Sequence, residues 1–129
     1  MPYADSNIFI AYFNVNDYFH QRSLKLMEEL RGKEFKITLA VVFEVVNYML
    51  KRRGKAAASD ALLFFRNAPN VELIFEGKAS WEETLKLFNK YELSLTDAEI
   101  AASMGKRGEN ELYTFDTDFE QFGWIKIKK

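Results

Sequence analysis

Short apolar runs typical of strands alternate along the chain with longer segments that have the period of an amphipathic helix. The expected strands are Pro2–Ala4, Glu34–Thr38, Val71–Phe75, Leu112–Phe115 and Trp124–Lys128. The expected helices are residues 6–13, Tyr18–Leu30, Leu39–Arg53, Lys55–Asn67, Ser80 to about Tyr91 and Thr96 to Gly105 or Gly108, with a helical turn over Thr117–Phe122. Five short strands separated by helices predict an α/β fold with a mainly parallel sheet.

Local signals suggest where several helices begin and end. Ser80–Glu83, Thr96–Glu99 and Thr117–Glu120 each match the capping-box pattern, in which a hydroxyl residue is followed three positions later by Glu. Gly32 is expected to end the helix before it. The apolar run inside Leu39–Arg53 is compatible with a strand as well as with a buried helix.

The length and composition predict one domain over residues 1–129. Hydrophobic residues make up 48% of the chain, enough for a packed core, and only two prolines and no low-complexity tract leave no room for a linker. The longest nearly apolar stretch, Leu39–Leu50, contains Glu44 and is too short to cross a bilayer. The first nine residues lack the basic and apolar regions of an export signal. We therefore expect a cytoplasmic protein without membrane contact.

The composition also narrows the possible chemistry. The chain has no cysteine and one histidine, His20, which excludes disulfide scaffolds, zinc-thiolate sites, cysteine nucleophiles and paired-histidine catalysis. With 18 Lys+Arg against 19 Asp+Glu, the net charge of -1 excludes a broadly basic nucleic-acid coat but permits a local basic patch. An enzyme of this composition would use carboxylates.

Two aspartates stand where apolar strands end. Asp5 follows the first strand, and Asp116 follows the fourth. Ligands of an open α/β sheet bind outside the carboxyl ends of the strands, so both acids can face one crevice. Asp97, near the start of a helix, can point to the same place. Three such acids are candidates for a shared site.

Glu44 has almost entirely apolar neighbours, so we expect it to be buried and to need a cation or a hydrogen-bond donor. Two carboxylates about 4 Å apart repel by about 4 kcal/mol at an effective dielectric constant near 20. Converging acids therefore require positive charge. Oxygen ligands without His or Cys favour Mg²⁺ or Mn²⁺ over zinc, and such sites carry out phosphoryl chemistry.

Each acid also has a structural explanation. Asp5 is a possible helix cap, Asp97 lies in a capping box where an acid favours the helix dipole, and Glu44 can be a helix acid facing a lysine. Asp118 lies in another capping box, which favours a structural or supporting position. It is the order and context of these acids, more than any one of them, that favours a metal site.

Four segments together resemble the PIN-domain family, in particular the small single-domain toxins of VapBC toxin–antitoxin pairs. They cover nearly the whole chain, and the first and last are the most specific. The segments are YADSNIFIAYF (3–13), VVFEVVNYML (41–50), LSLTDAEIAASM (93–104) and LYTFDTDFEQFGWIKI (112–127).

The resemblance implies a PIN-like three-layer sandwich whose five-stranded sheet has the order 3-2-1-4-5. It implies a Mg²⁺- or Mn²⁺-dependent endoribonuclease, the toxin of a type II pair, that forms a homodimer and binds an antitoxin protein. Transferred to this sequence, the metal-binding and catalytic acids are Asp5, Glu44, Asp97 and Asp116, with Asn7 and Thr114 orienting ligands or water and Asp118 as an occasional fifth acid.

Basic residues near the ends of two helices are candidates for contacts with RNA phosphates. They are Lys51, Arg52 and Arg53, after Glu44, and Lys106 and Arg107, after Asp97. Cations at helix C-termini are equally expected because they complement the helix dipole.

Two other functions compete with the nuclease. One is a noncatalytic PIN-like module that binds RNA or a protein and keeps its acids for structure. The other is a phosphotransfer protein of the receiver or haloacid-dehalogenase type, suggested by the run Asp116-Thr117-Asp118. The dehalogenase motif, however, needs Thr or Val where Glu120 stands, and a receiver needs paired acids where only Asp5 is found.

Overall fold

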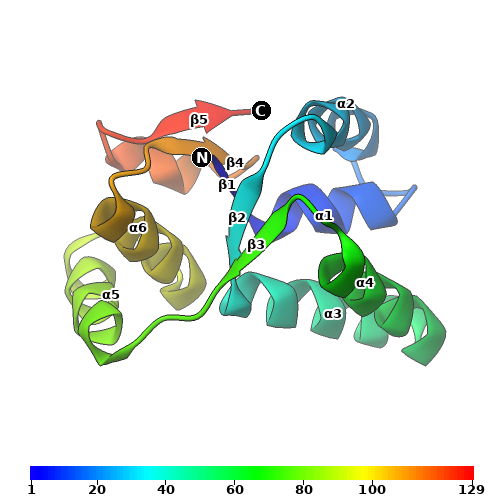
Figure 1. Cartoon of the computed structure of the whole chain (residues 1–129), viewed down its shortest axis with the longest axis horizontal. Coiled ribbons are helices and arrows are strands. Elements are labelled where there is room, and N and C mark those ends of the chain that lie inside the picture. Colours follow the sequence, from blue (N-terminus) through cyan, green and yellow to red (C-terminus); the bar gives the residue numbers. More distant parts are fainter.

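The computed structural model describes all 129 residues and contains six α-helices, a short 3₁₀ helix and five strands (Figure 1). The strands are β1 (Tyr3–Ala4), β2 (Phe35–Thr38), β3 (Val71–Ile74), β4 (Glu111–Tyr113) and β5 (Lys126–Lys128). The helices are α1 (Ser6–Phe13), α2 (His20–Arg31), α3 (Leu39–Arg53), α4 (Lys55–Asn67), α5 (Lys78–Lys90), α6 (Leu95–Arg107) and the 3₁₀ helix η1 (Thr117–Gln121). None of the helices combines the length and apolarity needed to cross a membrane.

All five strands form one parallel sheet in the order β3-β2-β1-β4-β5, which confirms the predicted fold class and strand order. Helices α1 to α4 lie on one side of the sheet and α5 and α6 on the other (Figure 1). The strand order reverses where β1 meets β4, and ligands of open α/β sheets bind at such a point. This is where the first and fourth strands deliver Asp5 and Asp116.

The central strand β1 is only two residues long, and the core on either side of it fixes its position. Tyr3 is fully buried and Ala4 nearly so. On one side, the ring of Phe9 in α1 packs edge-on against Phe65 of α4, with centroids 5.0 Å apart, and stacks on Phe35 of β2 at 6.1 Å. Such aromatic pairs contribute about 0.5–1.5 kcal/mol each beyond their burial. These packing contacts therefore hold the start of α1 in place at the carboxyl end of β1.

The predicted capping box at Ser80 is wrong. Helix α5 begins at Lys78, with Gly77 as its N-cap and no side-chain cap. Ser80 is buried inside the first turn, and its hydroxyl donates to Glu76 Oε2 at 2.8 Å. Its hydroxyl thus connects the helix to the segment after β3.

The other two predicted capping boxes are displaced by one or two residues. Ser94, not Thr96, caps α6, and its Oγ accepts a hydrogen bond from the Asp97 amide at 3.1 Å. Asp116, not Thr117, caps η1 by accepting from the amide of the residue two positions later. At both helix starts the observed N-cap thus is, or lies close to, an aspartate at the carboxyl ends of the strands.

Two glycines near the end of α6 provide a matched test of this geometry. Gly108 ends the helix in the left-handed region, at φ +69°, whereas an added Cβ at Gly105 would lie 3.7 Å from Trp124, an ordinary contact. We expect Gly108→Ala to lower the free energy of unfolding by about 1 kcal/mol and Gly105→Ala to raise it by up to about 1 kcal/mol. Urea unfolding of the two variants measures both values, and equal signs would contradict this account.

Candidate metal centre

Asp5 joins the end of β1 to the start of α1 and is only 2% exposed. As the N-cap of α1, its Oδ1 accepts from the Ser6 amide at 2.7 Å. Its Oδ2 accepts from Thr114 Oγ1 at 2.8 Å and from Asn7 Nδ2 at 3.3 Å. Its own amide donates to the Tyr113 carbonyl at 2.9 Å, which ties the ends of β1 and β4 together. The position and orientation of this carboxylate are thus fixed by four neighbours.

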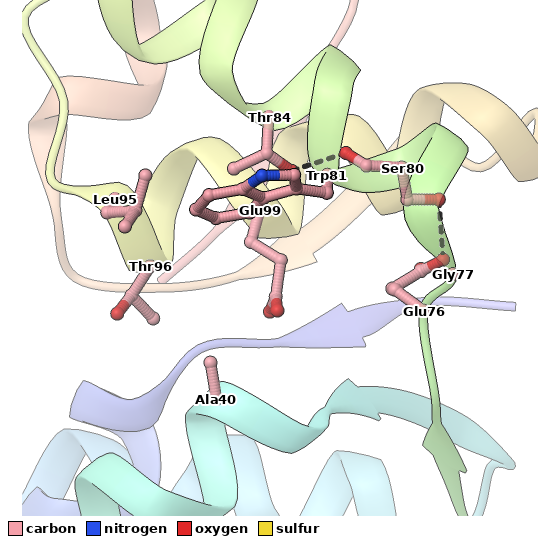
Figure 2. Close-up of a pocket in the computed structure, with 9 residues that line it drawn as sticks. All are labelled: Ala40, Glu76, Gly77, Ser80, Trp81, Thr84, Leu95, Thr96 and Glu99. Atoms are coloured by element: carbon pink, nitrogen blue, oxygen red, sulfur yellow. Dashed lines mark hydrogen bonds between the residues drawn. The ribbon is translucent and has the colours of Figure 1, made fainter.

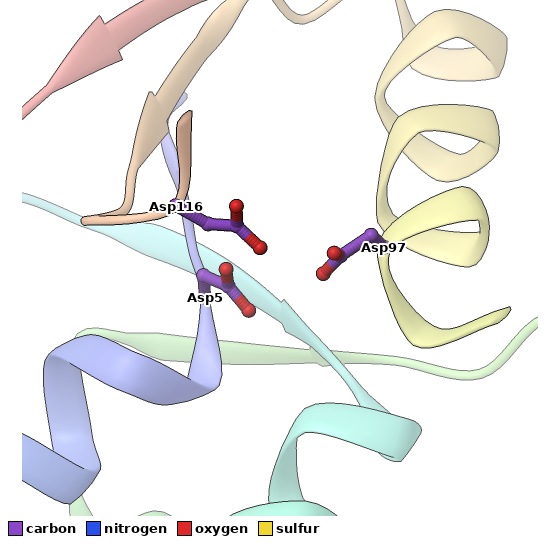
Figure 3. Close-up of side chains that lie close together, drawn as sticks. All are labelled: Asp5, Asp97 and Asp116. Atoms are coloured by element: carbon purple, nitrogen blue, oxygen red, sulfur yellow. The ribbon is translucent and has the colours of Figure 1, made fainter. Parts of the chain in front are cut away.

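Asp97 and Asp116 bring two further carboxylates to Asp5. Asp97 lies in the first turn of α6 and is 7% exposed, and Asp116 follows β4. One oxygen of each of the three side chains lies within 4.8 Å of the others. Figure 3 shows the three carboxylates pointing toward one another from the start of α1, from α6 and from the segment after β4. The structure therefore places three of the four predicted acids in one cluster.

Asn7 and Thr114 hold the two strand ends in register around this cluster. Asn7 Nδ2 donates to Thr114 Oγ1 at 3.1 Å, and its Oδ1 accepts from the Phe115 amide at 3.1 Å. Thr114 Oγ1 also accepts from the Asp116 amide at 3.0 Å. These two side chains thus position both Asp5 and Asp116, and their role in orienting a ligand or water stays a prediction.

When its carboxyls ionise, the cluster has no cationic side chain to balance the negative charge. None of the salt bridges in the structure includes Asp5, Asp97 or Asp116. At separations near 4.8 Å, each ionised pair repels by roughly 3 kcal/mol at an effective dielectric constant near 20. The cluster therefore favours binding either protons or a cation.

The pKa values reflect this repulsion. Burial raises the pKa of Asp5 to about 6, against the hydrogen bonds from Thr114 and Ser6 and with further repulsion from nearby acids. Burial also raises the pKa of Asp97 to about 8, reinforced by the negative charges of Asp5 and Asp116. Both carboxyls are thus reluctant to ionise while no cation is bound.

The ligand atoms fit a hard divalent cation. The cluster offers carboxylate oxygens from three separate elements and no nitrogen or sulfur ligand. Mg²⁺ and Mn²⁺ prefer such oxygen ligands, and a doubly charged ion would offset the repulsion that the carboxylates generate. The residues present therefore fit a hard divalent cation.

The prediction that Glu44 is buried in apolar surroundings is wrong. Helix α3 packs Val41 and Val45 into the core but leaves Glu44 exposed, together with Asn47 and Phe43, which is 60% exposed. The apolar neighbours in sequence thus lie partly on the solvent side of the helix. Glu44 needs no compensating cation to occupy this position.

Ser6 connects Glu44 to the cluster, and sequence reasoning missed it. The Ser6 hydroxyl donates to Glu44 Oε1 and lies 3.4 Å from Asp5 Oδ1. Glu44 therefore stands at the edge of the cluster, outside the group of three carboxylates. The one signal available in the sequence is a hydroxyl residue directly after the candidate acid Asp5.

Asp118 lies outside the group of three carboxylates. Its side chain is exposed, and its amide donates to Asp116 Oδ1 at 2.8 Å. Asp118 thus orients the Asp116 carboxylate through its backbone.

The basic residues of α3 lie away from the cluster. Lys51, Arg52 and Arg53 are exposed at the C-terminal end of the helix. Arg53 follows Glu44 by nine residues, about 14 Å along a helix axis. Arg53 Nη2 donates to Asn14 Oδ1 at 2.8 Å, whereas the Lys51 side chain forms no such bond. These basic residues can therefore contact only a ligand that extends well beyond the carboxylate cluster.

The basic residues of α6 differ from each other. Arg107 forms an internal ion pair, with Nη1 2.6 Å from Glu76 Oε1, and also donates to Ser103 Oγ at 3.0 Å. Lys106 is half exposed, and its Nζ lies 3.9 Å from Glu76. Arg107 thus fastens α6 to the segment after β3, and Lys106 is the residue of the pair with an accessible charge.

Comparisons with known proteins agree with this fold. The family model described as PIN domain matches residues 3–125. The structure is similar to Mycobacterium tuberculosis VapC20, described as a sarcin-ricin loop cleaving toxin, at 23% identity over 97% of each chain with a TM-score of 0.86. A toxin–antitoxin complex from Klebsiella pneumoniae matches at 22% identity over 98% of this chain and 96% of that one, with a TM-score of 0.73.

A third structure is VapBC2 from Rickettsia felis bound to a promoter DNA fragment, at 20% identity over 99% of this chain and 98% of that one, with a TM-score of 0.69. At these identities the likeness establishes the fold. A search of curated proteins found no match.

The raised pKa values of Asp5 and Asp97 predict two opposite effects on stability. A rise in pH should destabilise the metal-free protein, and binding of a divalent ion should stabilise it. Because Asp5 and Asp97 bind protons more tightly in the folded than in the unfolded chain, their contribution to stability is present below about pH 4 and is lost as the pH rises through about 6 and 8. Excess Mg²⁺ or Mn²⁺ at about 100 times its Kd should raise the free energy of unfolding by about 2.7 kcal/mol. That gain should be larger at pH 8.5 than at pH 5, because protons compete with the ion.

Thermal unfolding with EDTA or with added metal measures both effects. Asp97→Asn should make the metal-free protein more stable than wild type at pH 8.5 and abolish the metal response. Asp60→Asn, on the exposed side of α4, is the matched control and should change neither. A metal response that survives in Asp97→Asn would place the ion elsewhere.

Proposed function

The chain belongs to the PIN-domain family, and from this premise we propose that it is a divalent-metal-dependent endoribonuclease that hydrolyses phosphodiester bonds of RNA. The observation that carries the proposal is a cluster of three carboxylates, two of them buried, at the point where the strand order reverses, with no cation to balance them. A phosphotransfer protein of the receiver or dehalogenase type has no support in this family membership.

In this proposal Asp5, Asp97 and Asp116 hold Mg²⁺ or Mn²⁺. The bound ion supplies positive charge to the phosphate and makes the attacking water more acidic. Thr114 and Asn7 keep the Asp5 carboxylate oriented through hydrogen bonds of 2.8 and 3.3 Å. This fixed arrangement of charge requires little reorganisation during the reaction.

Glu44 has a separate part in the proposed reaction. It stands at the edge of the cluster, exposed to solvent, and receives a hydrogen bond from Ser6. An exposed carboxylate in this position can accept a proton from the attacking water and release it to solvent. In this proposal the reaction needs no histidine, and the single histidine of the chain, His20, lies in α2.

The negative cluster repels RNA, so cations around it have to hold the substrate. Lys106, half exposed on α6, and the Lys51–Arg53 group at the end of α3 are the proposed phosphate contacts. In this proposal a single RNA strand crosses the site between these two groups of cations. Arg107, committed to Glu76, contributes by positioning α6.

We further propose that the chain is the toxin of a type II toxin–antitoxin pair, acts in the cytoplasm as a homodimer and is inhibited by an antitoxin protein. The support is the likeness over nearly the whole chain to the M. tuberculosis toxin and to the K. pneumoniae and R. felis complexes. The absence of cysteine suits a reducing compartment.

The nuclease proposal predicts that the purified protein cleaves RNA with Mg²⁺ or Mn²⁺ and not with EDTA. Asp5→Asn and Asp97→Asn should each lower the rate at least about 100-fold, because each removes one of the charges that fix the site. Asp60→Asn should cleave at the wild-type rate. Cleavage of a labelled RNA followed on a gel measures these rates, and equal rates in all four proteins, or no cleavage by any, would favour a noncatalytic RNA- or protein-binding module.

The toxin proposal predicts that induced expression of the chain stops the growth of a bacterial host. Asp97→Asn, expressed at the same level on a blot, should leave growth unchanged, because the arrest requires cleavage. Growth curves with and without inducer provide the measurement. Arrest by both proteins would show that the effect does not depend on the metal centre.

A further inference from the structure

A cavity of about 240 Å³ lies between α5, α6 and the start of α3, and the proposed reaction does not use it. Trp81 and Thr84 of α5, Thr96 and Glu99 of α6 and Ala40 of α3 are among its lining residues (Figure 2). Ligand sites for drug-sized molecules are about 300–1,000 Å³. This cavity is therefore large enough for one small group and smaller than a site for a drug-sized ligand.

The cavity lies directly beside the metal centre. Thr96 precedes Asp97 in the first turn of α6, and Glu99 follows it two residues later. Side chains three positions apart share a helix face, so Thr96 and Glu99 face the cavity together while Asp97 faces the other carboxylates. An RNA strand with a phosphate at the cluster would bring a neighbouring base to the cavity.

Glu99 has an unused hydrogen-bond acceptor. Its Oε1 is the only buried side-chain nitrogen or oxygen atom in the structure without a hydrogen-bond partner. Buried polar atoms almost always have a partner, so this carboxylate is incomplete in the isolated chain. An ionised carboxylate can only accept hydrogen bonds. A group that completes the site for the ionised carboxylate therefore has to bring N–H or O–H donors.

The other acid of the cavity is already satisfied. Glu76 Oε1 is 2.6 Å from Arg107 Nη1, and its Oε2 accepts from Ser80 Oγ at 2.8 Å. These contacts fix the cavity wall after β3. They leave Glu99 as the acid that is free to bind a ligand.

Trp81 supplies a flat surface over the same cavity. Its side chain is half exposed, and Figure 2 shows the indole ring lying across the cavity, with the Glu99 side chain extending beyond it toward α3. Unpaired RNA bases stack on aromatic faces and are recognised by hydrogen bonds to their Watson–Crick edges. The cavity offers both kinds of contact.

We propose that this cavity binds an unpaired guanine of the RNA substrate, with Trp81 against the face of the base and the Glu99 carboxylate accepting hydrogen bonds from its Watson–Crick edge. The inference rests on the proposed function, since it assigns the base next to the cleaved bond. Guanine presents two adjacent donors on that edge, N1–H and N2–H. Adenine, cytosine and uracil each place an acceptor beside a donor, so a carboxylate binds them less well.

Nucleoside binding tests the proposal without metal or cleavage. The chain has two tryptophans, so Trp124→Phe leaves Trp81 as the single fluorescent reporter. Guanosine, titrated into this protein in EDTA, should change the Trp81 emission with a Kd at least about tenfold lower than that of adenosine, cytidine or uridine. Equal affinity for the four nucleosides would overturn the proposal.

Glu99→Gln in the same background identifies the recognising group. An amide offers one donor and one acceptor, which matches the edge of adenine, so the tenfold preference for guanosine should vanish or reverse. Glu82→Gln, an exposed neighbour on α5, is the control and should keep the preference. If Glu99→Gln keeps its fold, as judged by unchanged far-UV circular dichroism, and still prefers guanosine, Glu99 is not the group that recognises the base.

A second readout separates this inference from the nuclease proposal. On a mixed-sequence RNA with Mg²⁺, the wild type should cut next to guanine and Glu99→Gln should cut with relaxed preference. Absence of cleavage together with guanosine binding would overturn only the nuclease proposal. Cleavage without base preference would overturn only the guanine site, and a change of oligomeric state in Trp81→Ala with unaltered base preference would reassign Trp81 to an interface.

Discussion

Repulsion among three carboxylates is the constraint that the rest of the structure has to overcome. Their oxygens lie within 4.8 Å of one another, and two of the three side chains are buried. The sheet supplies the necessary rigidity, because the Asp5 amide is bound to the Tyr113 carbonyl and joins the ends of β1 and β4. Asn7 and Thr114 extend this connection through their side chains. Folding thus creates the negative site, and a cation stabilises it.

Much of the fold could be predicted because the alternation of strand and helix patterns in the sequence is typical of a parallel α/β sheet. Helices α1 and α4 lie where the pattern placed them. The strand order came from the family resemblance, and the apolar run of α3 left strand and helix both open until the fold resolved them. The helix caps were predicted wrongly because the local sequence is compatible with more than one cap. Around the start of α6 the chain offers two overlapping patterns, Ser94 with Asp97 and Thr96 with Glu99, and local sequence does not choose between them. Packing of α6 against its neighbours selects the first and releases Glu99.

The site was predictable where strand ends define it and unpredictable where helix faces do. Asp5 and Asp116 meet because their strands are neighbours. Glu44 was misjudged because the apolar run around it spans both faces of α3, and the sequence does not reveal which face is covered. The cavity below Trp81 depends on how α5 packs on α6 and how both approach α3, so no motif marks it.

The three acids of the proposed metal site also differ in what they contribute to the fold. Asp5 caps α1 and Asp116 caps η1, whereas the Asp97 carboxylate caps no helix. Natural selection would therefore act on these positions unequally. Loss of Asp97 would remove a favourable charge from the first turn of α6 but no cap, whereas loss of Asp5 would remove the N-cap of α1. Of the three acids, the one at position 97 is therefore the least bound to the architecture, and its presence is explained more by the site than by the helix that carries it.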